Sequence, residues 1–252
     1  MKPLIVANWK MNPQTLTEAK QLFNSVKKGL KNIKNACPGL SRRVEVVICP
    51  PFVYLPQLQT TNYKLLKLGA QDCSWKKKGA FTGEISPSML KNLGCKYVII
   101  GHSERRKLGE TDEMINKKIK AALKIKLKPI LCIGETEKER KEGKTSEVLR
   151  NQLKKALNNL TIKQFNNLTI AYEPVWAIGT GNPCDPLEAK KALLFLRNFF
   201  KKQLILYGGS VNSKNAIPYI KKAQFQGFII GGASLRAKEF IEILKRVSKA
   251  QW

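Results

Sequence analysis

The segment YVIIGHSERR, at residues 97–106, decides the fold prediction for the rest of the chain. Its first four residues are apolar without polar alternation, which is typical of a parallel strand buried on both faces. The run ends at Gly101 and at the only histidine of the chain, His102, and the polar residues after it favour a helix start. Histidine suits proton transfer near neutral pH, although a lone histidine is more often structural. The segment therefore predicts a buried strand with a candidate functional group at its carboxyl end.

Seven other short runs share this buried-strand pattern. They are rich in Val, Ile and Leu and lie at Leu4–Ala7, Val44–Cys49, Leu65–Ala70, Pro129–Ile133, Leu168–Tyr172, Leu204–Tyr207 and Gly227–Ile230. A doubly wound open sheet would need a glycine fingerprint after the first strand, where the chain instead reads NWKMN at 8–12. The first strand therefore argues against that alternative.

Segments with a helical period separate most of these runs. Their apolar stripes cover residues 16–30, 114–123, 193–200 and 240–247. Helix starts are indicated at Asp185-Pro186 and at Thr111-Asp112-Glu113. Eight strand–helix alternations without a linker predict an α/β protein, a single-domain (β/α)₈ barrel that spans residues 1–252.

Composition narrows the class of protein. The chain has 252 residues, of which 43% are hydrophobic, and no apolar stretch is long enough to cross a bilayer. Only four apolar residues follow the N-terminal Met-Lys-Pro, too few for a signal peptide, so we expect a soluble, cytoplasmic protein without a membrane partner. Six cysteines form no C-x-x-C pair and there is one histidine, which argues against a zinc site and favours reduced thiols.

The formal net charge of +28 is extreme. It would attract anionic partners such as phosphorylated metabolites or nucleic acid. The lysines are spread along the chain without a basic tail, so a lysine-rich composition explains the charge better than a dedicated nucleic-acid surface does, and any polyanion binding is expected to be non-specific.

Polar residues and glycines gather where the predicted strands end. In a (β/α)₈ barrel these ends form the active site. Lys10 follows the first strand, and glycine pairs at 208–209 and 231–232 follow the last two. Because glycine lets backbone N–H groups approach an oxyanion, and the second pair runs into a predicted short helix at 233–235, we predict a phosphate site there.

The segment AYEPVWAIGTG, residues 171–181, places Glu173 at the end of another strand. Its apolar stretch, between a proline and two glycines, predicts a lid that closes and excludes water. Desolvation would make Glu173 a stronger base, suited to proton abstraction from carbon. His102 would polarise a carbonyl as a neutral imidazole, since a helix N-terminus disfavours the imidazolium. Lys10 would offset the negative charge of the substrate and of an enediolate.

These motifs resemble those of the triosephosphate isomerase family over the whole chain. The resemblance rests on NWKMN at 8–12, AFTGEIS at 80–86, GHSERR at 101–106, CIGE at 132–135, AYEPVWAIGTG at 171–181, YGGS at 207–210 and GGASL at 231–235. It implies a TIM barrel that interconverts dihydroxyacetone phosphate and D-glyceraldehyde 3-phosphate through an enediolate, in glycolysis and gluconeogenesis. It also implies that no metal or organic cofactor takes part.

The resemblance assigns roles to named residues. Glu173 would shuttle the proton and His102 would be the neutral electrophile, with Lys10 and Asn8 stabilising charge and Glu104 supporting the site. The backbone N–H groups of Gly179, Ser210, Gly231 and Gly232 would hold the phosphate. It also implies a homodimer in which the loop at 73–84 enters the partner, so that Thr82 reaches toward the partner's active site.

Four departures from the family pattern bear on these expectations. The lid exit reads Asn182-Pro183-Cys184, where Pro183 predicts a stiffer hinge while the N–H of Cys184 still allows the family's bond to the Tyr207 hydroxyl. Gln226 replaces an aspartate that would pair with Arg197, so a glutamine–arginine hydrogen bond is expected instead. The stretch 197–204 is shorter than in the family. The run WKKK at 75–78 adds three charges to the dimer loop.

Two other classes of function are weighed against this one. A barrel aldolase would need a Schiff-base lysine inside a strand, and none of the predicted strands offers a convincing one. A polyanion-binding protein that reuses an isomerase scaffold stays open as a second role, because the net charge would support it.

Overall fold

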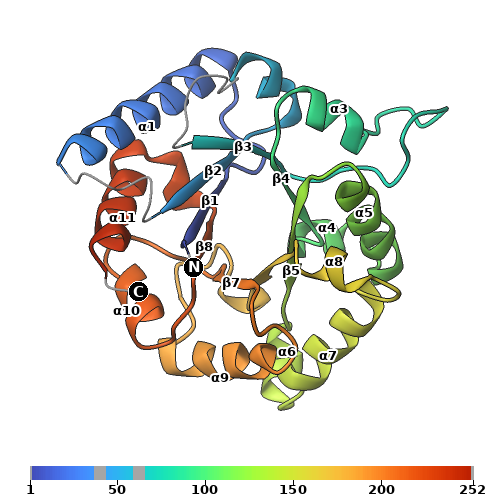
Figure 1. Cartoon of the computed structure of the whole chain (residues 1–252). Coiled ribbons are helices and arrows are strands. Elements are labelled where there is room, and N and C mark those ends of the chain that lie inside the picture. Colours follow the sequence, from blue (N-terminus) through green and yellow to red (C-terminus); the bar gives the residue numbers. More distant parts are fainter. Residues whose placement is uncertain (1, 37–43, 59–65, 251–252) are drawn as a thin grey trace.

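Eight parallel strands close into a barrel in chain order, with β1 paired to both β2 and β8 (Figure 1). The computed structural model describes residues 2–36, 44–58 and 66–250. The strands are β1 Leu4–Asn8, β2 Glu45–Cys49, β3 Leu66–Ala70, β4 Tyr97–Ile100, β5 Lys128–Ile133, β6 Thr169–Tyr172, β7 Leu204–Tyr207 and β8 Gly227–Ile230. Each predicted run matches one of these strands to within a residue, apart from Leu65, which lies outside the described residues, so the predicted α/β barrel is confirmed.

Helices form a ring around the strands (Figure 1). Those in the described residues are α1 Leu16–Ala36, α3 Pro87–Asn92, α4 Ser103–Lys107, α5 Asp112–Lys124, α6 Glu137–Lys141, α7 Thr145–Ala156, α8 Ile162–Phe165, α9 Pro186–Arg197, α10 Ala216–Lys221 and α11 Ala237–Lys249. Short 3₁₀ helices are η1 Phe52–Gln57, η2 Val175–Ala177 and η3 Gly232–Leu235. Both predicted helix starts are confirmed, since the side chains of Thr111 and Asp185 cap α5 and α9.

One predicted helical stretch is too long. The apolar stripe at 193–200 predicts a helix through Phe200, but α9 ends at Arg197. The Arg197 guanidinium donates to the carbonyls of Phe200 at 2.7 Å and Gln203 at 2.9 Å, and so holds the chain in a turn. The ring of Phe200 stacks on Phe165 with centroids 5.1 Å apart, so its burial does not need a helix.

Apolar layers on both faces of the sheet explain why polar and apolar residues do not alternate along the strands. In β1, Leu4 and Val6 belong to the cluster inside the barrel, while Ile5 and Ala7 belong to the larger cluster between the strands and the helices. Because both faces of each strand are buried, both must be apolar. The five cysteines in the described residues are free and buried, and Cys37 lies outside them.

At the end of the barrel where the strands begin, Gln226 stands in place of the aspartate that the family pattern pairs with Arg197. The Arg197 guanidinium donates a hydrogen bond to Oε1 of Gln226, which also accepts from the Ile205 N–H at 3.0 Å. The expected glutamine–arginine contact is therefore confirmed. None of the helices in the described ranges is long and apolar enough to span a bilayer.

Candidate active site

A cavity of about 330 Å³ opens at the carboxyl ends of the strands. It brings together residues that the sequence places far apart, and the predicted site residues on its wall are Asn8, Lys10, His102, Glu173, Gly179, Ser210, Gly231 and Gly232. Arg236, which the sequence analysis did not select, lines it as well. Glu173 is the one acidic side chain among the described lining residues, which include two cations, Lys10 and Arg236, and five glycines.

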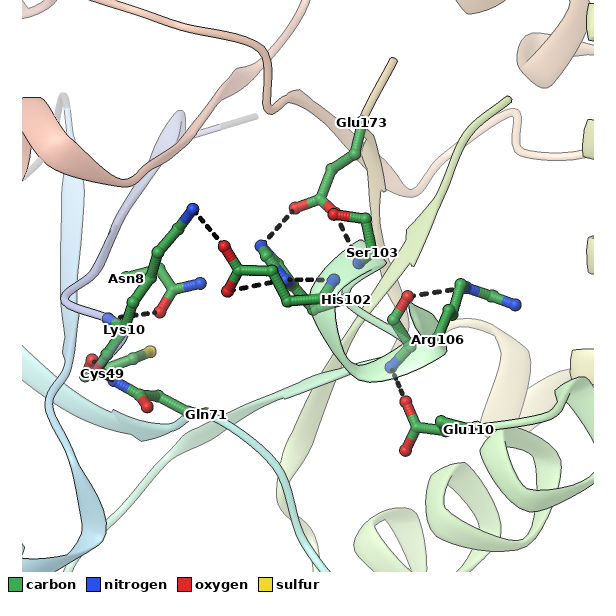
Figure 2. Close-up of polar contacts among 11 residues, drawn as sticks. Asn8, Lys10, Cys49, Gln71, His102, Ser103, Arg106, Glu110 and Glu173 are labelled. Atoms are coloured by element: carbon green, nitrogen blue, oxygen red, sulfur yellow. Dashed lines mark hydrogen bonds and ion pairs between the residues drawn. The ribbon is translucent and has the colours of Figure 1, made fainter. Parts of the chain in front are cut away.

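Glu173 leaves the end of β6 and faces His102 at the end of β4 (Figure 2). Its Oε1 lies 3.4 Å from Nε2 of His102, and its Oε2 accepts from the Ser103 N–H at 3.4 Å. The side chain is only 2% exposed. A Cβ at Gly134, the residue after β5, would lie 1.8 Å from the Glu173 carbonyl oxygen, so this position requires glycine.

The contacts of His102 select one tautomer of its ring. Nδ1 accepts the N–H of Glu104 at 3.2 Å, which makes His102 the N-cap of α4. A nitrogen that accepts a hydrogen bond carries no proton, so the hydrogen of the neutral ring sits on Nε2. Nε2 is therefore the ring nitrogen that can donate, and it faces the Glu173 carboxylate at the cavity wall.

Lys10 is held over the cavity by an unusual backbone. Its φ of 54° is left-handed, its N–H donates to Asn8 Oδ1 at 3.1 Å, and its carbonyl accepts from Gln71 at 2.8 Å (Figure 2). Its ammonium lies 2.6 Å from Glu104 Oε1. Strained backbone of this kind is found where a side chain must be aimed. Gln71, which directly follows β3, thus emerges as a positioning residue.

Gly208, Gly231 and Gly232 of the two glycine pairs form part of the cavity wall. Gly231 allows the Lys10 stem to approach, since a Cβ there would lie 3.1 Å from Lys10 Cε. The expected short helix after β8 is confirmed as η3. Ser210, with a left-handed φ of 46°, donates its hydroxyl to the Ala177 carbonyl at 2.6 Å and so ties this wall to the lid.

The entry to the lid is anchored by a glutamate whose role the sequence did not reveal. Buried Glu135 accepts from the Trp176 indole at 2.9 Å and from the Tyr172 hydroxyl at 3.1 Å. Burial raises the pKa of Glu135. The Arg140 guanidinium lies 3.8 Å from the Trp176 ring centroid. The motif at 132–135 contains Glu135, but its hydrogen-bond partners lie about forty residues further along the chain. No local sequence pattern therefore predicts these contacts.

Two tyrosines hold the exit of the lid at Cys184. The Cys184 N–H donates to the Tyr207 hydroxyl at 3.1 Å, as the family resemblance implies, and its carbonyl accepts from the Tyr219 hydroxyl. The two rings stack with centroids 4.0 Å apart. Burial raises the pKa of the Cys184 thiol to about 12, so the thiol stays protonated at neutral pH. Both backbone groups of this hinge residue are therefore fixed.

Removing the Tyr219 hydroxyl tests this clamp. We expect Tyr219→Phe to lower the free energy of unfolding by about 1 kcal/mol, because the Cys184 carbonyl loses its donor while the ring stack persists. Tyr219→Leu should cost more, since it also removes the stack from a residue that is 1% exposed. Urea unfolding measures both, and equal stabilities of wild type and Tyr219→Phe would refute the clamp.

Two predicted site residues do not line the cavity. Glu104 lies on α4 beside it, where its carboxylate contacts the Lys10 ammonium at 2.6 Å and lies 3.6 Å from Nδ1 of His102. Thr82 lies exposed in the loop between β3 and α3, which projects away from the barrel (Figure 1). Its expected role concerns a partner chain and stays a prediction.

Comparison with known proteins adds an independent line of evidence. A family model described as triosephosphate isomerase matches residues 3–247. The triosephosphate isomerases of Endomicrobium trichonymphae and of Aquifex aeolicus (strain VF5) are each 44% identical to the chain over 97% of its length, covering 98% and 99% of their own. That of Dehalococcoides mccartyi (strain CBDB1) is 44% identical over the whole chain and 99% of its own length.

Proposed function

The chain belongs to the triosephosphate isomerase family, and from this premise we propose how its residues divide the work of the reaction. It interconverts dihydroxyacetone phosphate and D-glyceraldehyde 3-phosphate, a step of glycolysis. The observation that carries the proposed roles is the 3.4 Å approach of the Glu173 carboxylate to Nε2 of His102, at the wall of a cavity lined by Lys10 and the glycine pairs.

Glu173 is proposed as the base. Its carboxylate takes a proton from C1 of dihydroxyacetone phosphate, the C–H electron pair becomes the C1–C2 double bond, and the carbonyl oxygen becomes an oxyanion. In the resulting enediolate the hydroxyl proton of O1 moves to O2, and the same carboxylic acid protonates C2. These transfers leave the C1 aldehyde and the C2 hydroxyl of the product and regenerate the Glu173 carboxylate. Burial of the carboxylate favours this transfer because water is excluded from it.

His102 and Lys10 are proposed to stabilise the oxyanion. The Nε2–H of the neutral imidazole donates to the substrate oxygen, and the ammonium of Lys10 offsets the charge of enediolate and phosphate. Triosephosphate isomerases are a standard illustration of a carboxylate base paired with a neutral imidazole. Asn8 holds the Lys10 backbone, and Glu104 both orients the Lys10 ammonium and offers its N–H to His102.

The phosphate is proposed to bind to backbone N–H groups of Gly179, Ser210, Gly231 and Gly232. All four residues line the cavity, and the start of η3 adds a favourable field for an anion. The proposed roles require no metal or organic cofactor. A coupled assay that follows turnover of either triose phosphate tests the activity itself, and absence of turnover by the folded protein would contradict it.

We further propose that residues 1–252 form one domain, that the protein works in the cytoplasm, and that it is a homodimer. The support for a dimer is the projecting loop between β3 and α3, whose tip carries exposed Phe81 beside Thr82. Met11, Val53, Met89 and Leu108 are exposed apolar side chains as well. Scattered exposed apolar residues are normal, but a loop that extends away from its own core favours a partner.

Light scattering tests the dimer and its dependence on salt. We expect a mass of twice 28.4 kDa at physiological salt. At low ionic strength the mass should fall toward that of one chain, since two +28 protomers repel each other and screening weakens. A mass of 28.4 kDa at every salt concentration would contradict the dimer.

The same charge predicts how substrate capture responds to salt. If the net charge of +28 steers the phosphorylated substrate, kcat/KM should fall as ionic strength rises from about 10 mM to about 200 mM. The value of kcat serves as the internal control, because the step after capture does not involve steering. A salt-independent kcat/KM would rule out steering.

A further inference from the structure

Arg236 is a cation of the catalytic cavity that none of the roles proposed above uses. It lines the cavity together with Gly231 and Gly232, and η3 separates it from Gly231 along the chain. Within this segment the Ser234 N–H and hydroxyl both donate to the Gly231 carbonyl, at 2.8 and 2.7 Å. The Arg236 N–H donates to the Ala233 carbonyl at 3.4 Å. Arg236 therefore ends a compact turn that begins at the proposed phosphate site.

The other polar side chains beside this site already hold the chain in place. The Ser210 hydroxyl donates to a lid carbonyl at 2.6 Å. Oδ1 of Asn212 accepts the N–H groups of Lys214 and Asn215, at 2.9 and 3.1 Å. The Arg236 guanidinium, by contrast, takes part in no hydrogen bond within the described ranges. Its donors are thus available to a ligand.

The charge of Arg236 is not neutralised by a carboxylate. No ion pair joins it to an acidic residue in the part of the chain that the structure describes. Glu239 is the acidic residue nearest to it in the sequence, but the Glu239 carboxylate accepts the Ser213 N–H at 2.6 Å. The ammonium of Lys10, the other cation on the described cavity wall, lies 2.6 Å from Glu104. Arg236 is therefore the unpaired cation of these two.

A guanidinium at this position fits a phosphate group. The phosphate of a triose phosphate carries a charge of about −1.5 to −2 at pH 7, and the Glu173 carboxylate places another negative charge in the cavity. The backbone N–H groups proposed to hold the phosphate bring no net charge against it. Arginine stays protonated, and its planar fork of N–H groups can bind two phosphate oxygens at once. Because Arg236 is exposed, it lies at the mouth of the cavity.

We propose that Arg236 binds the substrate phosphate, as a charged side chain added to the backbone N–H groups. This role rests on the proposed function of the cavity and extends it by one specificity-determining residue. The phosphate does not change during isomerisation, so Arg236 contacts it equally in the ground state and in the transition state. Such uniform binding acts on KM and on the affinity for phosphorylated ligands, and hardly on kcat.

Lys238 provides the matched control for Arg236. It lies two residues further along the chain, is also exposed and carries the same charge. It is not among the described residues that line the catalytic cavity. Lys238→Gln therefore removes one positive charge from the same part of the surface without removing a donor from the cavity.

Steady-state kinetics with dihydroxyacetone phosphate measure the contribution of Arg236. At about 150 mM salt, where diffuse attraction is screened, we expect Arg236→Gln to lower kcat/KM by about tenfold, almost entirely through KM. This factor corresponds to one lost hydrogen bond between charged groups. Lys238→Gln should change KM by less than about twofold. Calorimetric titration with 2-phosphoglycolate should show the same tenfold loss of affinity in Arg236→Gln, and it does not depend on turnover.

D-Glyceraldehyde, which has the reacting carbons but no phosphate, separates phosphate binding from damage to the site. NMR follows its isomerisation, and the tenfold loss in Arg236→Gln should be absent for this substrate. Thermal unfolding near the wild-type temperature verifies that both variants are folded.

Three results would overturn the role of Arg236. They are wild-type affinity of Arg236→Gln for 2-phosphoglycolate, an equal loss in Lys238→Gln, and a tenfold loss of D-glyceraldehyde turnover in Arg236→Gln. Failure of the proposed function is distinguishable from these, because wild type would then turn over neither triose phosphate. The calorimetric comparison of Arg236→Gln with Lys238→Gln would decide the role of Arg236 in that case too.

Discussion

Glu173→Gln is expected to lower kcat by about 10³-fold, within the range that a positioned general base contributes. Glutamine has the size of the glutamate and can still accept the Ser103 N–H through its amide oxygen, so the geometry of the seat is retained. What it loses is the basic carboxylate beside Nε2 of His102. The coupled isomerase assay measures the loss.

Glu242→Gln provides the matched control for Glu173→Gln. Glu242 is a half-buried residue of α11 that pairs with Arg246 and does not line the catalytic cavity. The same chemical change there should leave kcat within about twofold, since a surface ion pair contributes little. Turnover like that of wild type in Glu173→Gln would remove Glu173 from the role of base.

His102→Asn is expected to lower kcat by about 10²- to 10³-fold, as when one oxyanion donor is removed. The asparagine oxygen can still accept the Glu104 N–H and cap α4, so the change removes Nε2–H and keeps the cap. His102→Ala removes both. The two variants should therefore lose similar amounts of kcat in the coupled assay.

Thermal unfolding distinguishes the cap from the donor. The loss of the cap in His102→Ala should cost about 1 kcal/mol, whereas His102→Asn should unfold near the wild-type temperature. For a chain of this size that difference corresponds to roughly 2–4 °C in Tm. A kcat near that of wild type in His102→Asn would show that Nε2 does not polarise the substrate.

Much of the fold could be predicted because its signals are local. A strand buried on both faces is a continuous apolar run, and its carboxyl end is marked by the first polar residue or glycine, as at His102 and Glu173. Helix starts at Thr111 and Asp185 follow from the cap residue alone. The prediction for α9 was wrong at its end, because Arg197 closes the turn through contacts that periodicity does not encode.

The parts of the site that the sequence did not predict depend on long-range partners. The Tyr219 hydroxyl meets the Cys184 carbonyl, and the Trp176 indole meets Glu135, across 35 and 41 residues of chain. No rule of sequence spacing predicts such pairs, because the two residues meet only when the folded barrel brings distant segments together. The tautomer of His102 could not be predicted from the sequence either, because it depends on the hydrogen bond that the Glu104 N–H of α4 donates to the ring.

The nitrogen NMR signals of the imidazole test the division of roles between Glu173 and His102 most directly. Since His102 is the only histidine in the chain, a protein labelled with ¹⁵N-histidine gives one pair of ring signals without mutation. At about pH 7.5, with 2-phosphoglycolate bound, we expect a neutral ring with its proton on Nε2. A ring protonated on Nδ1, either as the other tautomer or as the imidazolium, would contradict this division of roles.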